Sequence, residues 1–282
     1  MLIDFHTHLF PDNIAQRAIE ALKNGIIKAQ GRLLLEPQTD GTKAGLLRSM
    51  DKYGVDMSIV MPIATSPTQH SRINAFAKEV TDGKRIISFG SVHPRQEDWE
   101  ETLENIAVTG LKGIKMHPEF QDFFIDEEIT EKIVKKCQDL GLWVLFHCGE
   151  DYGYKPPFRC TPQRLRNLID KTGGSNIIAA HFGSFRMWDD VEKYLIGTEI
   201  YMDTSMASGL LEGDKGREMV LAHGAERILF GSDNPWQNPS QALDFVHSMK
   251  LQKEAEELIL YKNAQRILCL SHQSVELHMP YG

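Results

Sequence analysis

Five histidines and one aspartate stand at or just after the ends of apolar runs in the sequence: His6, His8, His117, His147, His181 and Asp233. The sharpest signal is the first pair, in which one residue separates two histidines. Side chains alternate between the two faces of a strand, so His6 and His8 point the same way, about 6–7 Å apart. Both imidazoles can then reach a single ion at roughly 2.0–2.1 Å. The spacing predicts a metal site at the first strand.

The apolar runs alternate with longer segments of helical period, which is typical of strand–helix units around a parallel sheet. We expect eight strands, at residues 2–6, 57–62, 86–92, 113–117, 143–147, 176–181, 200–203 and 228–231. Eight such units predict an α/β fold, a single (β/α)8 TIM barrel. In this fold the active site lies at the C-terminal ends of the strands, where the six residues stand.

Two connections depart from this regular pattern. The first, residues 9–43, contains a predicted helix at 13–28 and is long enough to cover the barrel mouth as a lid. The second, residues 149–161, follows the fifth strand. A terminal helix is predicted at 254–270 and a tail at 271–282. No break in composition marks a second domain, so we expect residues 1–282 to form one domain.

The composition is that of a globular protein, with 41% hydrophobic and 25% charged residues. A formal net charge of −8 and the lack of a long Lys/Arg block argue against nucleic acid as a partner. The four cysteines include no C-x-x-C pair and predict neither a thiolate zinc site nor a disulfide framework. The N-terminus lacks signal-peptide features, and no apolar run approaches the roughly 20 residues that span a bilayer. We therefore expect a cytoplasmic protein without membrane association.

Motifs whose residues could take part in chemistry or in the fold around it are spread over nearly the whole chain. They are His6-Thr7-His8, Gly113-Ile114-Lys115-Met116-His117-Pro118, His147, His181, Phe230-Gly231-Ser232-Asp233 and Asn263-Ala264-Gln265-Arg266-Ile267-Leu268. This ordered set resembles the metal-dependent amidohydrolase superfamily. The closer similarity is to the amidohydrolase 2 group, which includes aminocarboxymuconate-semialdehyde decarboxylase, resorcylate decarboxylases and dicarboxylate lactonases. The resemblance implies metal ligation by His6, His8, His147 and Asp233, with His181 as a general acid/base or substrate-polarising group.

Neutral imidazoles and one carboxylate suit a divalent ion, zinc first and manganese as the alternative. A site of three or four ligands with a water left over is the catalytic form, and its ion lowers the pKa of bound water to about 7. We expect one ion rather than two. Lys115 is the only candidate for a carboxylated lysine that bridges two metals, but it precedes His117 by two residues and would lie a layer deeper.

Substrate binding is expected from His117 and from three side chains in loops at the same end of the barrel, Arg186, Trp236 and Arg159. A guanidinium matches the geometry of a carboxylate, so we expect a carboxylate-bearing substrate. Structural alternatives stay open, because an arginine can be a surface residue and a tryptophan can serve packing. A strand-end aspartate such as Asp233 can also cap the helix that follows.

The sequence predicts a metal-dependent hydrolase that acts on a small amide, lactone or ester through metal-activated water. His181 and Asp233 are the expected catalytic residues, with Asp233 accepting the proton of that water. One alternative is a nonoxidative decarboxylase of a small unsaturated or aromatic acid, because the amidohydrolase 2 group holds both chemistries on nearly the same ligands. A non-catalytic metal-containing binding protein is a further alternative. The expected partner is a small-molecule substrate, and a homo-oligomer stays open.

Overall fold

The structure, a computed structural model, describes residues 1–270. These residues contain eight short strands: β1 (Ile3–Thr7), β2 (Met57–Val60), β3 (Ile86–Ser88), β4 (Gly113–Met116), β5 (Trp143–Phe146), β6 (Ile177–Ala179), β7 (Tyr201–Asp203) and β8 (Ile228–Leu229). Each of the eight predicted strands is present. Most are shorter than predicted; β4 and β5, for example, end one residue before His117 and His147.

The strands pair in parallel as two sheets, of order β1-β2-β3 and β4-β5-β6-β7-β8. Backbone hydrogen bonds join the two sheets at both seams. Between β3 and β4, the Gly90 N–H donates to the Gly113 carbonyl at 2.8 Å and the Lys115 N–H donates to the Gly90 carbonyl at 2.9 Å. Between β8 and β1, the Phe5 N–H donates to the Phe230 carbonyl at 2.8 Å. The strands therefore close into the predicted (β/α)8 TIM barrel.

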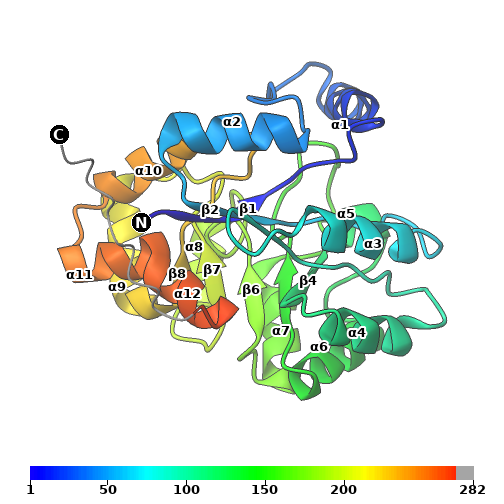
Figure 1. The fold of residues 1–282 in the computed structure, drawn as a ribbon. Coiled ribbons are helices and arrows are strands. Elements are labelled where there is room, and N and C mark those ends of the chain that lie inside the picture. The colour runs from blue at the N-terminus through cyan, green and yellow to red at the C-terminus, as the bar shows by residue number, and fades with distance from the viewer. Residues whose placement is uncertain (271–282) are drawn as a thin grey trace.

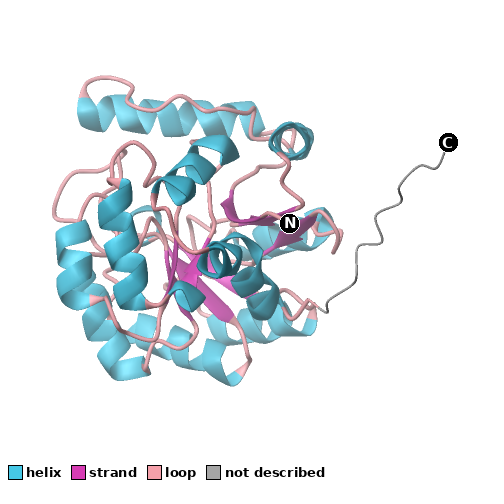
Figure 2. Ribbon diagram, turned by 90° about the vertical axis from the view of Figure 1, so that its left-hand side faces the viewer, coloured by secondary structure: helices cyan, strands magenta, loops and turns pink. Residues whose placement is uncertain are grey.

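Helices surround the strands, which gather at the centre of the molecule (Figure 2). In chain order they are α1 (Ala15–Gln30), α2 (Lys43–Tyr53), α3 (His70–Val80), α4 (Trp99–Val108), α5 (Pro118–Gln121), α6 (Glu128–Asp139), α7 (Pro162–Thr172), α8 (Trp188–Tyr194), α9 (Gly213–His223), α10 (Pro239–Ser248), α11 (Lys253–Glu257) and α12 (Asn263–Leu268), with a 3-10 turn at Ala225–Arg227 and a π-helical turn at Leu258–Lys262. The helix predicted at 254–270 is thus α11, the π turn and α12.

Strand residues alternate between two buried environments. On β4, Ile114 and Met116 belong to the apolar core that also contains helix residues such as Leu165 and Leu168 of α7. Lys115 lies between them in sequence, so its side chain points to the opposite face, into the barrel. The period-two alternation thus separates apolar packing against the helices from polar groups inside the barrel.

The long first connection, residues 9–43, carries α1 and lies apart from the other helices (Figure 1). Gln30 Nε2 donates to the Tyr152 carbonyl at 3.0 Å, and the Gln38 N–H donates to the Pro235 carbonyl at 2.6 Å. Tyr152 follows β5 and Pro235 follows β8, so this connection contacts the C-terminal ends of strands that lie apart in the ring. A role as a lid and the single-domain assignment stay predictions.

The predicted tail, residues 271–282, lies outside the described residues. Within residues 1–270, no helix is both long enough and apolar enough to cross a bilayer.

Candidate active site

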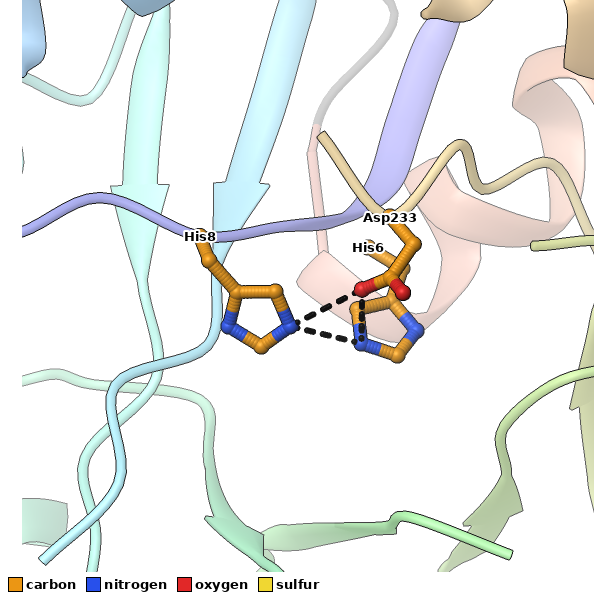
Figure 3. A group of neighbouring side chains, drawn as sticks. All are labelled: His6, His8 and Asp233. Atoms are coloured by element: carbon orange, nitrogen blue, oxygen red, sulfur yellow. Dashed lines mark hydrogen bonds and ion pairs between the residues drawn. The ribbon is translucent and has the colours of Figure 1, made fainter. Parts of the chain in front are cut away.

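Three of the predicted metal ligands meet at one point. The Nε2 atoms of His6 and His8 lie 3.2 Å apart, and Asp233 Oδ1 lies 3.4 Å from the first and 3.0 Å from the second. Figure 3 shows both rings and the carboxylate turned toward one another, from the first strand and from the turn that follows β8. His6 and Asp233 are buried and His8 is partly exposed. We call these three residues the His6–His8–Asp233 cluster.

The hydrogen-bond partners of His6 and His8 at Nδ1, the ring nitrogen that points away from the cluster, determine which nitrogen of each ring carries the proton. His6 Nδ1 lies 2.8 Å from Asp203 Oδ2, and His8 Nδ1 lies 2.8 Å from the Met61 carbonyl oxygen. A carboxylate and a carbonyl only accept, so both rings carry the proton on Nδ1 and turn the Nε2 lone pair inward. Two lone pairs and a carboxylate oxygen at these distances repel one another unless a cation lies among them. The donor set therefore fits a divalent metal ion.

The four buried histidines of this region are neutral near pH 7. Burial lowers the pKa of His6, His117, His147 and His181 well below the ordinary value of 6.5. For His6 and His117, the charge of Lys115 lowers the pKa further. The neutral imidazole is the form that binds a metal, so His6 and His147 are in the protonation state that their proposed role as ligands requires.

Lys115 places a cationic group against the cluster. Its side chain is only 1% exposed, and Nζ lies 3.3 Å from His6 Nε2. Burial lowers the pKa of Lys115 to about 8, although the nearby carboxylates Asp233 and Asp203 oppose the shift. Lys115 is therefore largely protonated at neutral pH, and its ammonium group can attract an anion to the place where the metal ligands meet.

His181 follows β6 and lies beside the cluster. Its backbone is left-handed, with a φ of 62°, and Asp233 shares this conformation with a φ of 69°. Both are uncommon for residues other than glycine, and such positions concentrate at functional sites. The ring of His181 stacks on that of His6 with 5.3 Å between centroids. His181 is therefore placed to act on a molecule bound at the cluster.

His147 reaches the same region but has other partners. Its Nδ1 lies 3.0 Å from His181 Nε2, and its Nε2 lies 3.1 Å from the Glu150 carbonyl oxygen. That carbonyl only accepts, so Nε2 carries the proton and Nδ1 keeps the lone pair. Of the four predicted ligands, His147 is thus the one outside the compact cluster. Its ligation of the metal, through Nδ1, stays a prediction.

His117 lines the site through its ring faces. Its ring stacks on Phe120 with 3.7 Å between centroids and on His147 with 4.0 Å. Nδ1 accepts the Phe120 N–H at 3.3 Å and so caps α5. Nε2 then carries the proton and lies 3.3 Å from Asp151 Oδ2. Both ring nitrogens are engaged, and substrate contact by His117 stays a prediction.

The two arginines predicted to bind substrate differ in their partners. Arg159 Nη1 lies 2.8 Å from Glu119 Oε2, whose side chain is 1% exposed, and Nη2 lies 2.5 Å from Asp122 Oδ1. Both terminal nitrogens of the Arg159 guanidinium are thus paired with carboxylates, which argues for a structural role of Arg159. Arg186 is 47% exposed and lies 3.5 Å from Glu150 Oε2. Arg186 is the better placed of the two to bind an anion.

Trp236 stands in the same turn as Asp233. Its backbone N–H donates to the Asp233 carbonyl at 2.8 Å, and its side chain is partly exposed. The predicted contact of Trp236 with substrate remains compatible with this position and stays a prediction.

Aromatic rings gather around the histidines. Phe185 lies 5.9 Å from His181 and 5.3 Å from Tyr152, measured between ring centroids. On the His117 side, Phe120 lies 5.8 Å from Tyr154. These rings give the site apolar walls around polar and charged groups, which is the usual makeup of a small-molecule site.

Asp203 and Ser205 are functional candidates that the sequence analysis missed. Asp203 is fully buried at the end of β7 and accepts the proton of His6. The Ser205 hydroxyl lies 2.9 Å from His181 Nδ1. The signal that identified the histidines, a polar residue at the end of an apolar strand, is also present at Asp203.

Comparison with known proteins places this site in a family. The amidohydrolase family (Amidohydro_2) matches residues 3–270. No curated protein matches the chain.

Solved structures share the fold at low sequence identity. A 5-carboxyvanillate decarboxylase from Novosphingobium aromaticivorans, with bound manganese and 3-methoxy-4-hydroxy-5-nitrobenzoic acid, is 15% identical over 96% of this chain and 97% of its own, with a TM-score of 0.72. A dihydroxybenzoic acid decarboxylase from a Polaromonas species, with bound manganese and 2-nitroresorcinol, is 16% identical over 99% of each chain, with a TM-score of 0.65. An uncharacterized TIM-barrel protein from Bordetella bronchiseptica is 15% identical over 95% of this chain and 98% of its own, with a TM-score of 0.72.

The family match covers nearly the whole chain and agrees with the barrel and with the resemblance seen in the sequence. The protein is an enzyme of the amidohydrolase family.

Proposed function

We propose that this enzyme is a metal-dependent, nonoxidative decarboxylase of a small aromatic acid. The observation that carries the proposal is the meeting of three features at one place: the His6–His8–Asp233 cluster, the neutral His181 beside it, and the aromatic rings around them. Apolar walls suit an aromatic ring, while the cluster and Lys115 suit its carboxylate and neighbouring oxygens.

The similar structures favour this alternative over the hydrolase that the sequence alone suggested. Two of them are decarboxylases of hydroxylated benzoic acids, each with bound manganese. We therefore propose manganese rather than zinc as the ion, one per chain, held by His6, His8 and Asp233 with His147 as the fourth ligand. Imidazole nitrogens with one carboxylate can bind either ion, so the choice of manganese depends on the comparison.

A divalent cation at this cluster supplies positive charge that holds substrate oxygens and offsets negative charge as the reaction proceeds. The side chains supply the rest. His181 is neutral, so one of its ring nitrogens carries a proton and can donate a hydrogen bond to a substrate oxygen and polarise the ring. A neutral imidazole in this role needs a lowered pKa, which burial provides.

Asp233 is the group that we propose carries the proton for the ring carbon. Burial raises its pKa, although the nearby His8 and the charge of Lys115 oppose the shift. The proton moves from a carboxyl oxygen of Asp233 to the carbon that bears the substrate carboxylate, forming a C–H bond. The C–C bond to the carboxylate then breaks, its electron pair returns to the ring and CO2 leaves. One proton enters and one CO2 departs, with no water consumed.

The cationic side chains would orient the substrate. Lys115 lies inside the barrel next to the cluster, and Arg186 lies at its rim. Two cations at different depths can hold an anionic substrate with its reacting carbon near Asp233. Phe185 and Tyr152 would exclude water from the same space, which strengthens these charge interactions.

We propose a cytoplasmic location as well. The four cysteines form no dense disulfide framework in the sequence, which is in keeping with a reducing compartment.

A substrate panel tests the proposal. Purified enzyme reconstituted with Mn²⁺ is incubated with hydroxylated benzoic acids, muconate-type acids, lactones and small amides, and released CO2 is measured. We expect CO2 from an aromatic acid, and no CO2 after chelation of the metal or from a His6→Ala, His8→Ala variant. Turnover of lactones or amides alone would contradict the decarboxylase proposal and support the hydrolase predicted from the sequence. Ligand binding without any turnover would favour the non-catalytic binding protein.

A further inference from the structure

His181 has a backbone conformation that a residue with a side chain rarely adopts. Its φ is 62°, and the next two residues, Phe182 and Gly183, are left-handed as well, with φ of 56° and 89°. Such a conformation persists in a residue other than glycine only where the surrounding contacts hold it. The turn leaves the ring of His181 stacked on that of His6 and places Phe182 in the apolar core. The contacts of the His181 backbone therefore decide where its ring lies.

The peptide groups on both sides of the His181 Cα are held by hydrogen bonds. The His181 N–H, in the preceding peptide, donates to Asp203 Oδ1 at 3.1 Å. In the following peptide, the Phe182 N–H donates to the Asp203 carbonyl at 2.6 Å, and the His181 carbonyl accepts the indole Nε1–H of Trp188 at 3.2 Å. The φ and ψ of a residue set the relative orientation of its two flanking peptide planes. Asp203 and Trp188 together thus fix the backbone of His181.

Trp188 is itself supported where it reaches this carbonyl. It is the first residue of α8, and its ring meets that of Phe185 edge to face, with 6.3 Å between centroids. The Phe185 backbone is bound to the loop that follows β5, because its N–H donates to the Cys148 carbonyl at 2.9 Å and its carbonyl accepts the Glu150 N–H at 3.1 Å. The indole therefore packs on a segment that two backbone hydrogen bonds join to the neighbouring loop.

Removal of the indole N–H would leave the His181 carbonyl without this donor. His181 is only 3% exposed, and a buried backbone carbonyl without a donor costs free energy comparable to a lost hydrogen bond. The peptide that follows His181 would then be held at one end only, by the Phe182 N–H. A rotation of this peptide toward another donor changes the ψ of His181. The ring of His181 then leaves its place beside His6.

We propose that Trp188 is a positioning residue for His181, and that its indole N–H, by holding the His181 carbonyl, keeps the ring where it meets bound substrate. The inference rests on the proposed function in one respect, that His181 acts on the substrate. It applies to decarboxylation and to hydrolysis alike. A displacement of about 1 Å in a group that acts on the substrate can cost roughly 10²-fold in rate.

Crystal structures of the wild type and of Trp188→Phe test the geometry without a substrate. Trp188→Phe keeps an aromatic ring next to Phe185 but has no donor for the carbonyl. We expect a left-handed His181 in the wild type, and in the variant a rotated peptide after His181 with its ring displaced. Trp143→Phe is the control, because Trp143 stands at the N-terminal end of β5, the end opposite the site, and packs against Tyr201. An unmoved His181 in Trp188→Phe would overturn the proposal, whatever reaction the enzyme catalyses.

Kinetics with any substrate that the panel identifies show whether Trp188 acts through His181. We expect Trp188→Phe to lower kcat about 10- to 100-fold with KM within about twofold, because a displaced ring costs rate while the binding groups stay. In a His181→Ala background, Trp188→Phe should change kcat by no more than about twofold, since the group that it positions is gone. The same loss in both backgrounds would refute the proposal. So would a rise in KM at unchanged kcat, which would indicate direct substrate contact by Trp188.

An isosteric replacement separates the hydrogen bond from packing. β-(3-Benzothienyl)alanine at position 188 keeps the shape of tryptophan and has sulfur in place of the indole N–H, so it should reproduce the loss of kcat seen in Trp188→Phe. Wild-type kcat with this residue would show that packing, and not the hydrogen bond, places His181. Mn²⁺ affinity should stay within about twofold of the wild type in Trp188→Phe, because the indole binds the His181 backbone rather than a metal ligand or an acceptor behind one. A larger loss of affinity would make the role of Trp188 merely structural.

Discussion

The carboxylate of Asp203 accepts the Nδ1–H of His6 at 2.8 Å, across 197 residues of the chain. This bond joins β7 to β1 inside the barrel and sets the tautomer of His6, the first proposed metal ligand. The ring of His8 is held in the same tautomer by the backbone carbonyl of Met61. Acceptors behind the two rings thus turn both Nε2 lone pairs toward the proposed metal position.

The first prediction concerns metal content. His6→Ala, His8→Ala should purify without the roughly one divalent ion per chain that we expect for the wild type, because both converging nitrogens are gone. Elemental analysis of both proteins measures this. His247→Ala is the control, since His247 is exposed and lies beside Glu256, away from the cluster. Equal metal content in the double variant and the wild type would refute the ligand assignment.

The second prediction separates the metal ligands from the residue that acts on substrate. His181→Ala should keep metal occupancy near that of the wild type and lose about 10²–10³ in kcat, the usual cost of a preorganised donor. Asp233→Asn should lose both metal and activity. Metal analysis beside single-turnover kinetics would check this, and loss of metal in His181→Ala would make His181 a ligand instead.

The third prediction compares the two arginines. Arg186→Met should raise KM roughly 10- to 100-fold for an anionic substrate, the range for one charge-assisted hydrogen bond. Arg159→Met should instead lower the free energy of unfolding by about 2 kcal/mol, because buried Glu119 loses its partner. Steady-state kinetics and urea unfolding of both variants distinguish the roles. The assignment fails if Arg159→Met raises KM while Arg186→Met leaves it unchanged.

The fourth prediction concerns the stability of the metal-free protein. Four histidines whose pKa lies well below 6.5 in the folded state take up protons on unfolding as the pH falls below 6.5. The unfolded state then binds more protons, so their contribution to stability is present above pH 6.5 and is lost as the pH falls. Urea unfolding between about pH 5 and pH 7 should show a falling free energy toward acid.

A buried carboxyl opposes that trend and provides an internal check. Burial raises the pKa of Asp4 from 3.8 to about 7, so the folded state holds an extra proton between these values. The stability from Asp4 is present at low pH and is lost as the pH rises toward 7. Asp4→Asn should therefore steepen the loss of stability toward acid. If the free energy of unfolding of the wild type does not change with pH, and Asp4→Asn does not alter this pH dependence, the pKa shifts that we attribute to burial are wrong.

Local patterns were enough to predict the barrel and much of the site. Eight apolar runs separated by helical segments predict eight parallel strands, and the period of two places His6 and His8 on one face. The rule that strand ends meet at one side of a barrel brings Asp233 to the same place. Each of these arguments uses only neighbours in sequence and the symmetry of the fold.

Partners between distant parts of the chain could not be predicted in the same way. Arg159 forms its ion pair with Glu119, and His147 lies beside His181 instead of joining the compact cluster. Which acceptor a ring or a guanidinium finds depends on loop paths and rotamers after the barrel has closed. For the same reason, Asp203 could be recognised as a polar strand end, but its hydrogen-bond partners could not.

The most direct test of the account follows one substrate turnover in isotopically labelled water. An aromatic acid that the Mn²⁺ enzyme consumes is incubated in D2O and, separately, in H2¹⁸O, and the product is analysed by mass spectrometry. Decarboxylation predicts CO2 together with one deuterium at the carbon that lost the carboxylate, and no ¹⁸O in the aromatic product. Incorporation of ¹⁸O into the product without CO2 would contradict the proposed decarboxylase and establish hydrolysis.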